Sequence, residues 1–215
     1  IAPFRPMTYN GGIGRSFTEA AMSSARSPAY TPQEYLALDR VADEKSEYWD
    51  GALYAMTGAS RAHNLIAVNL ATALNTQLRA RPCEVYAADM RVRIPRTYRY
   101  LYPDVVVVCD EPQFEDDQHD ILINPTLLVE VLSPSTEAYD RGKKFDSYRR
   151  IPGLVTYLLV AQDERRIHLY IRQPDNQWLF AAFTEAEDVI DLPAIGCALP
   201  LADVYSKVSL PPSAD

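Results

Sequence analysis

Two short apolar runs constrain the fold of this chain more than any other feature. Residues 105–109 read VVVVC and residues 127–132 read LLVEVL. Side chains alternate between the two faces of a strand, so a run that is apolar at nearly every position has both faces buried. Because helical patterns precede and follow these runs, we expect an α/β fold with a central mixed β-sheet flanked by helices on both faces.

Short-range signals place a helix and a hairpin before this sheet. Thr31, followed by Pro32 and Glu34, forms a capping-box pattern that predicts a helix start. Asp50-Gly51 lies between the runs SEYW and ALYAM and predicts a tight hairpin turn. These signals give the fold an N-terminal helix and β-hairpin.

A longer helix and further strands are predicted next. Apolar residues recur every four positions from Ile66 to Leu78, with Ser60 as N-cap, and this period predicts an amphipathic helix. His63 then lies at the helix start, on its inward-facing side. Strands are predicted at 84–95, 102–110 and 125–133, a helix at 140–150, a strand at 154–161, a C-terminal β-hairpin at 165–183 and a short helix at 198–208.

The length and composition of the chain fit one compact domain. Of 215 residues, 47% are hydrophobic and 23% are charged, as in ordinary globular proteins. Residues 1–28 lack periodicity and predict a flexible extension, whereas residues 29–210 predict a single domain. No apolar run approaches the ~20 residues that span a bilayer, and no signal-peptide pattern is evident, so we expect a cytoplasmic protein.

The three cysteines, Cys83, Cys109 and Cys197, are far apart and odd in number. This spacing supports neither a zinc site nor a disulfide framework. Cys109 ends a strand-like apolar run and is most simply a buried thiol in a reducing compartment.

The charge distribution gives a mixed indication about nucleic acid. The net charge of −8 argues against a broad non-specific phosphate-binding surface. Two cationic clusters nevertheless stand out, one at 91–99 and one at 141–150. Solvated charge on hairpin and helix surfaces explains each cluster equally well.

Two acids interrupt the apolar strands. Glu130 shares a face with Leu128 and Leu132, and Asp104 shares one with Val106. If the two strands are neighbours, the carboxylates meet near one edge of the sheet and repel each other when both are ionised. Mg²⁺ removes this repulsion, because it prefers oxygen ligands that include one or two carboxylates. The alternative is a structural acid that is bonded to backbone or paired with arginine.

A lysine follows these acids on the next predicted helix. Asp140, Lys144 and Tyr148 are spaced four apart and share one helix face. With Tyr148 packed inward, Lys144 lies at the border of the buried face, where it can polarise a water or neutralise a phosphate. The alternative is an ordinary surface pair between Asp140 and Lys144.

Three further polar residues are weaker candidates. His63 is placed to contact substrate or a metal-bound water, and Glu47 to act as an outer metal carboxylate. A histidine at a helix start is more often a satisfied residue of the cap region. Asp89, on the predicted strand at 84–95 that precedes the Asp104 strand, is the weakest of the three.

In the order and spacing of its segments, the chain resembles the Uma-two family of restriction endonuclease-like proteins, within the PD-(D/E)XK nuclease superfamily. The resemblance covers Tyr30 to Val208 and is carried by YTPQEYLAL, SEYWDGALYAM, the helix opening HN, YPDVVVV, PTLLVEVLSPST, the D-x-x-x-K-x-x-x-Y run from Asp140, and IPGLVTYLLV. It implies a restriction endonuclease-like core and Mg²⁺-dependent phosphodiester hydrolysis.

The resemblance also implies roles for individual residues. Pro103-Asp104 matches the PD element, and Glu130 matches the acid of the second element. Leu132 stands where the usual pattern has lysine, and Lys144 matches the place to which this family's lysine has migrated. Glu47 corresponds to the superfamily's early glutamate, although His63 opens the helix that often bears it.

We therefore expect a Mg²⁺-dependent endonuclease that acts on DNA, with Mn²⁺ as a substitute ion. Asp104 and Glu130 are the expected metal ligands, Lys144 orients the water, and Glu47 or His63 completes the site. The cationic clusters would engage the phosphate backbone of DNA, and a homodimer would cut both strands. The alternative is a catalytically inactive nuclease fold for nucleic-acid binding or protein interaction, which the acidic charge and Leu132 favour. A carboxylate-pair glycosidase has little support in the sequence.

Overall fold

The structure is a computed structural model that describes residues 29–56 and 58–211. These residues form two compact units, one of 29–56 with 97–100 and one of 58–96 with 101–211, and each is described by itself. The predicted extension at 1–28 lies outside the described residues. The single domain expected over 29–210 stays a prediction.

The smaller unit contains the predicted helix and hairpin. Thr31 caps helix α1 (Pro32–Asp39) with a complete capping box to Glu34. Strands β1 (Ser46–Trp49) and β2 (Ala52–Ala55) pair antiparallel around Asp50 and Gly51, both of which have positive φ, as a tight two-residue turn requires. Residues 99–100 of β5 (Arg99–Leu101) pair with β1 on its other side. The core of this unit is a cluster of three tyrosine rings, Tyr35, Tyr48 and Tyr100.

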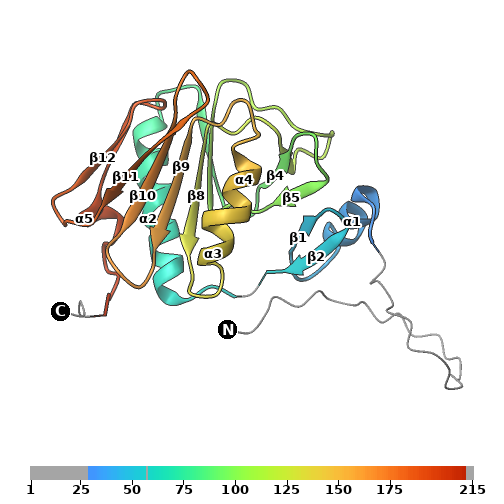
Figure 1. The fold of residues 1–215 in the computed structure, drawn as a ribbon, viewed down its shortest axis with the longest axis horizontal. Helices are drawn as coiled ribbons and strands as arrows, with labels where there is room; N and C mark the ends of the chain where they lie inside the picture. The colour runs from blue at the N-terminus through green and yellow to red at the C-terminus, as the bar shows by residue number, and fades with distance from the viewer. Residues whose placement is uncertain (1–28, 57, 212–215) are drawn as a thin grey trace, which may run out of the picture. The chain divides into compact units, whose positions relative to one another are not determined.

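The larger unit is built on a six-stranded sheet in the order β11-β10-β9-β8-β6-β3 (Figure 1). Only the β8–β9 pair is parallel within this sheet, and the other neighbours are antiparallel. The strands are β3 (Cys83–Ala87), β6 (Val105–Cys109), β8 (Leu127–Leu132), β9 (Thr156–Ala161), β10 (Ile167–Arg172) and β11 (Trp178–Phe183). Two smaller pairings complete the unit: β4 (Arg91–Ile94) with β7 (Ile121–Leu122), and β12 (Val189–Leu192) with β13 (Cys197–Pro200).

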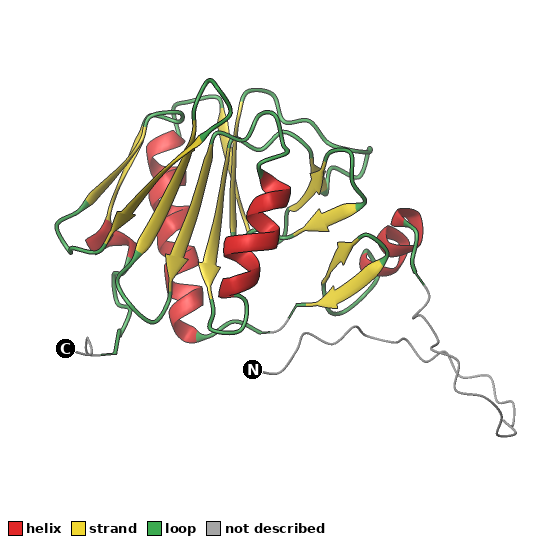
Figure 2. Cartoon of the chain, viewed as in Figure 1, coloured by secondary structure: helices red, strands yellow, loops and turns green. Residues whose placement is uncertain are grey.

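Helices cover both faces of this sheet, as the sequence predicts (Figure 2). Helix α2 (Arg61–Leu78) packs its buried apolar stripe against side chains that include Val105, Val129 and Leu158, and we call this side of the sheet the apolar face. The opposite side, which carries Glu130 and Tyr157, is the polar face. It lies against a continuous helical segment of α3 (Glu137–Tyr139), the π-helical turn η1 (Asp140–Lys144) and α4 (Phe145–Tyr148). The short helix α5 (Leu201–Val204) follows β13.

One predicted strand is two strands in the structure. The run at 84–95 breaks after Ala87, because Ala88 adopts a positive φ and Asp89 turns the chain. The first half, β3, joins the six-stranded sheet, and the second half, β4, pairs with β7 instead. Strands β5, β7, β12 and β13 had no counterpart in the sequence interpretation, because each is short and lacks a long apolar run.

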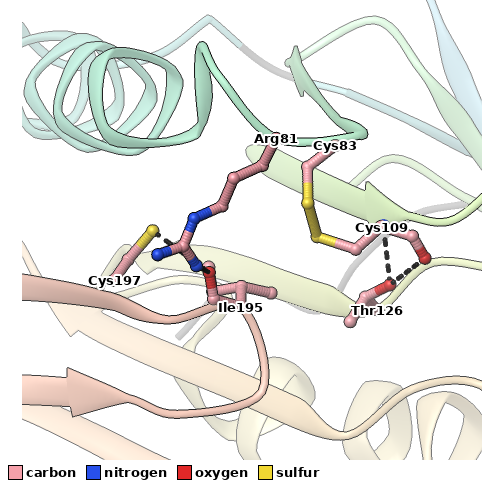
Figure 3. Close-up of a disulfide and its surroundings, with 6 residues drawn as sticks. All are labelled: Arg81, Cys83, Cys109, Thr126, Ile195 and Cys197. Carbon is pink, nitrogen blue, oxygen red and sulfur yellow. Dashed lines mark hydrogen bonds between the residues drawn. A yellow bond between two sulfur atoms is a disulfide. The ribbon is translucent and has the colours of Figure 1, made fainter.

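The expectation that no disulfide forms is wrong, and so is the interpretation of Cys109 as a free thiol. Cys83 and Cys109 are joined by a disulfide across the β3–β6 pair (Figure 3). They are 26 residues apart in sequence, but the antiparallel register places them directly opposite each other, with a Cα–Cα distance of 4.1 Å. Cys197 is a buried free thiol. The reducing compartment was inferred from Cys109 as a free thiol, and the disulfide removes that reason.

Among the described helices, none is both long enough and apolar enough to cross a bilayer.

Candidate active site

The strands that carry Asp104 and Glu130 are neighbours in the sheet. Strands β6 and β8 pair antiparallel, with Val105 opposite Val129 and Val106 opposite Leu128. Asp104 directly precedes β6, and its carboxylate oxygen Oδ2 accepts a hydrogen bond from the Val131 backbone N–H at 2.7 Å. The Asp104 backbone N–H also donates to the Val129 carbonyl at 3.0 Å, so Asp104 lies beside residues 129–131 of β8. The two strands are neighbours, as the sequence analysis requires for a shared site, and the convergence of the two carboxylates stays a prediction.

Glu130 is buried on the polar face and has cationic and neutral donors around it. The Lys144 ammonium lies 3.1 Å from each carboxylate oxygen of Glu130. The Tyr148 hydroxyl donates to Oε1 at 2.7 Å. The side chains of Glu130 and Lys144 are only 4% and 8% exposed, so water screens their charges little. Burial of one charge would cost several kcal/mol on its own, and the pairing offsets that cost.

The π-helical turn brings a second acid to the same ammonium. Asp140 Oδ1 lies 3.5 Å from Lys144 Nζ, and the Asp140 side chain is 4% exposed. Because the pair is buried, the surface-pair alternative for these two residues is wrong. π-helical turns are rare and often mark functional positions, since they add a residue to a helix and reorient its side chains.

Tyr157 lies beneath this cluster on strand β9. Its hydroxyl donates to the Asp140 backbone carbonyl at 3.1 Å. Burial first, and then the negative charges of Glu130 and Asp140, raise the pKa of Tyr157 well above its usual value. Asp104 and Lys144 also act on this phenol, so all four charges converge around one buried ring. Tyr157 is therefore a neutral donor at physiological pH.

His63 holds Asp104 from the start of helix α2. Ser60 caps this helix, accepting from the His63 backbone N–H at 3.1 Å. The ring nitrogen Nε2 lies 3.2 Å from Asp104 Oδ1. Burial lowers the pKa of His63, but the hydrogen bond and charge of Asp104, with the charge of Asp140, outweigh it and raise the pKa overall. The other nitrogen, Nδ1, is buried and has no hydrogen-bond partner within the described part of the chain.

Comparison with known proteins places this arrangement in a family. Residues 32–202 match the family Uma2, which is described as "Putative restriction endonuclease". The chain belongs to the Uma2 family. Two relatives come from Synechocystis sp.: the uncharacterized protein slr1290 is 41% identical over 182 residues, which is 85% of this chain and 94% of that protein. The uncharacterized protein sll1609 is 39% identical over 158 residues, or 74% of this chain and 89% of that protein.

A solved structure shares the fold of this Uma2 protein. The crystal structure of a protein from Anabaena variabilis, named a putative nuclease belonging to DUF820, aligns with a TM-score of 0.69. The alignment covers 84% of this chain and 99% of the other, at 19% sequence identity. At this identity the match shows a common mixed α/β fold and carries no information about the reaction.

Two weaker candidates from the sequence are Glu47 and Asp89. Glu47 is buried on strand β1 of the smaller unit, opposite Tyr54, and its role as an outer metal carboxylate stays a prediction. Asp89 is exposed in the turn after β3, rather than on a strand.

Three arginines of the first cationic cluster form ion pairs, each within its own unit. Arg91 is buried and pairs with Asp120 at 2.5 Å, and Arg93 lies 3.3 Å from Glu115. Arg99 pairs with Asp50 in the smaller unit. These ion pairs favour the structural interpretation of the arginines at 91–99 over phosphate binding, which stays a prediction.

Sequence reasoning missed three groups of this site. Tyr148 was expected to pack inward, but not to bond Glu130. Tyr157 is a hydroxyl-bearing residue within the apolar run 154–161, and that exception was the available signal. The Val131 N–H is a backbone donor to Asp104. A side-chain pattern does not reveal which backbone N–H groups are left outside the sheet hydrogen bonds and can donate to a carboxylate.

The Mg²⁺ site expected from the sequence stays a prediction. Among the residues that the structure describes, no group of three or more His, Cys, Asp or Glu side chains is placed to hold a metal. Asp104 and Glu130 are two carboxylates from adjoining strands, and Mg²⁺ commonly binds one or two carboxylates together with waters and substrate phosphates. His63 reaches Asp104 through Nε2, and its buried Nδ1 has no hydrogen-bond partner among the described residues.

Proposed function

We propose that this protein is a metal-dependent endonuclease that hydrolyses phosphodiester bonds in DNA, with Asp104 and Glu130 as the ligands of Mg²⁺. The observation that carries the proposal is the bond of Lys144 to both oxygens of Glu130, beside the strand end that bears Asp104. In metal-dependent phosphodiester hydrolysis, carboxylates can hold the ion and an amine can stabilise the negative charge of the transition state. Membership of the Uma2 family supports the same reaction class.

The chain's own groups have distinct tasks in this reaction. When bound, the ion supplies a Lewis acid for a phosphate oxygen and lowers the pKa of a water. The Lys144 ammonium supplies positive charge for the oxygens of the transition state. Tyr148 fixes the orientation of Glu130 by its hydrogen bond, and His63 fixes that of Asp104.

Cleavage of supercoiled plasmid in Mg²⁺ or Mn²⁺ tests this function. The variants Asp104→Asn and Glu130→Gln keep the shape of each side chain but remove its charge, and we expect cleavage to fall by at least about a hundredfold. Asp146→Asn is the matched control, because Asp146 is an exposed acid on α4 that forms an ion pair with the exposed Arg149. Cleavage that survives both site substitutions would remove the mechanism.

A second function, a catalytically inactive nuclease fold that binds nucleic acid or protein, is favoured by one observation. Glu130 already has its charge balanced by Lys144 inside the protein, without any ion. This version predicts no heat of binding when Mn²⁺ is titrated in a calorimeter. Binding that disappears in Glu130→Gln would count against the inactive version and support the enzyme.

The proposal includes a homodimer, because two sites would cut both strands of a duplex. Sedimentation velocity over a range of protein concentrations tests this part independently of catalysis. A monomer at all concentrations would exclude it.

A further inference from the structure

The outer part of the polar face carries a row of rings with an arginine. On strands β10 and β11, Tyr170 pairs opposite Phe180, and Arg172 opposite Trp178, so their side chains share this face. His168 lies on the same face and meets Phe180 edge to face at 5.0 Å. We call these five residues the ring surface: His168, Tyr170, Arg172, Trp178 and Phe180.

The ring surface is continuous with the candidate active site. A row of ring contacts starts on strand β11 and runs through Phe180, Tyr170, Phe145, Tyr157 and Tyr148. Neighbouring ring centroids in this row are 4.7 to 5.5 Å apart. The hydroxyl of Tyr148, the last ring, donates to Glu130. Tyr157 and Tyr148 are fully buried, so the row links the exposed rings to Glu130 through the protein interior.

The outer end of this row is open. Phe180 is 51% exposed, Trp178 and Tyr170 are partly exposed, and the small residue Ala182 next to them is exposed too. Figure 1 shows that, among the described elements of this unit, α3 and α4 lie over the β8 side of the sheet, and β10 and β11 extend beyond them. Large exposed rings gathered on one surface are a mark of a binding site.

Cations border the rings. The Arg172 guanidinium lies over the Trp178 ring, 4.9 Å from its centroid. Arg141 on η1 bonds the His168 ring, and Arg149 beyond α4 is 55% exposed. Glu137 and Asp146 are bonded to Arg141 and Arg149, so part of this charge is balanced within the protein. The exposed rings with arginines beside them match a ligand that has both flat apolar surfaces and negative charge.

We propose that the ring surface binds the unpaired bases of single-stranded DNA whose backbone the active site cleaves. This inference rests on the proposed function, because it names the form of DNA that the nuclease takes. Bases stack on aromatic side chains whatever their sequence, and arginines beside the rings engage the phosphates. In a duplex the bases are stacked on each other and cannot cover the rings. A purely apolar partner would not use the arginines.

Binding without catalysis tests this inference. Fluorescence anisotropy with a labelled oligothymidine of about 20 nucleotides, in the presence of EDTA, measures affinity while metal is absent. We expect the wild-type protein to bind this strand more tightly than the corresponding duplex. Phe180→Ala should weaken binding about five- to a hundredfold, since one stacked ring contributes that much.

Leu179→Ala is the matched control. Leu179 adjoins Phe180 on β11 and is 58% exposed, but pairs opposite Ile171 and so points to the other face. We expect this variant to bind within about twofold of wild type, because stacking on the ring surface is unchanged. An equal loss in both variants, or none in Phe180→Ala, would overturn the ring surface as the site.

An oligomer of abasic sites separates stacking from attraction to phosphate alone. It keeps the phosphates but has no bases, so we expect it to bind at least about tenfold more weakly than oligothymidine. Equal affinity would overturn the inference. In a Trp49→Phe background, Trp178 is the remaining tryptophan, and its emission should be quenched by oligothymidine. An unchanged emission at saturating oligothymidine would contradict stacking there.

The binding and cleavage experiments distinguish failure of the ring surface from failure of the proposed nuclease function. Oligothymidine binding that depends on Phe180, together with absent plasmid cleavage, would leave the ring surface in place and remove the nuclease. Plasmid cleavage that depends on Asp104 and Glu130, with binding that is indifferent to Phe180, would do the reverse.

Discussion

The two faces of the six-stranded sheet are made by the same strands but have opposite chemistry. On the apolar face, Val105, Val107, Leu127, Val129 and Val131 pack on α2 with almost no exposure. On the polar face, Glu130 lies between Leu128 and Leu132, and Tyr157, His168 and Arg172 follow on the neighbouring strands. Because side chains alternate along a strand, one face can supply hydrophobic stability while the other holds charge.

This difference shows that the stability of the polar face depends on the pairing of its charges, whereas the stability of the apolar face depends on how well its side chains fill the space. A buried hydrocarbon group needs only close-packed neighbours, but a buried charge needs a specific partner at a specific distance. Glu130 meets this need through Lys144 and Tyr148. The following predictions separate the two kinds of dependence.

The largest effect is expected from Lys144→Met. This change removes the ammonium from two buried acids, Glu130 and Asp140, and leaves uncompensated charge inside the protein. We expect the free energy of unfolding to fall by about 3–5 kcal/mol. Urea denaturation measures this loss.

A second variant shows whether charge is the cause. In Glu130→Gln/Lys144→Met, the glutamine is neutral and still accepts from Tyr148, so the part of the loss that comes from Glu130 should return, while Asp140 stays uncompensated. An equal cost of Lys144→Met in both backgrounds would mean that the lysine does not stabilise the fold through the charge of Glu130.

On the apolar face, Leu70→Ala should destabilise the fold through the volume that it removes. Leu70 is fully buried on α2, and its truncation leaves a cavity, so we expect a loss of about 2–5 kcal/mol in urea denaturation. Below its melting temperature this variant should keep the plasmid cleavage and oligothymidine binding of wild type. A selective loss of either activity would show that the two faces are not independent.

The disulfide gives the apolar face a covalent tie. Cys83 and Cys109 pack against the apolar core and close a loop with a sequence separation of 26. Reduction, or Cys83→Ser/Cys109→Ser, should lower the free energy of unfolding by about 2–4 kcal/mol, because the unfolded chain regains loop freedom. Urea denaturation with and without dithiothreitol measures this change. The double serine variant should not respond to the reductant; if wild type does not respond either, the bond does not stabilise the fold.

The features that could be predicted from sequence are those with short-range causes. The capping box at Thr31, the turn at Asp50-Gly51 and the stripe from Ile66 to Leu78 each lie within one element, and all are confirmed. The shared face of Lys144 and Asp140 is likewise a property of one helix, and the two side chains do pair.

The features that could not be predicted depend on register between distant segments. Cys83 faces Cys109 only because β3 and β6 pair antiparallel in one register of several possible ones. The donation from the Val131 N–H to Asp104 likewise requires the geometry of a strand end. The split of the run at 84–95 requires a positive φ at Ala88, a residue that rarely adopts one. The alternation of apolar and polar residues along a strand specifies neither the register, nor the strand-end hydrogen bond, nor the positive φ.

The smallest effect is expected from pH, through His168 on the polar face. Burial, and then the charges of Arg141 and Arg166, lower the pKa of His168 to about 4 from an unfolded value of 6.5. Between these values the unfolded chain binds more protons than the folded one, so stability should fall as pH drops from 6.5 towards 4 and level off below that. The ring is partly exposed, and screening keeps the effect below about 1 kcal/mol. Urea midpoints at several pH values measure it, and His168→Gln should flatten this part of the profile. An equal slope in wild type and variant would assign the pH dependence to other groups.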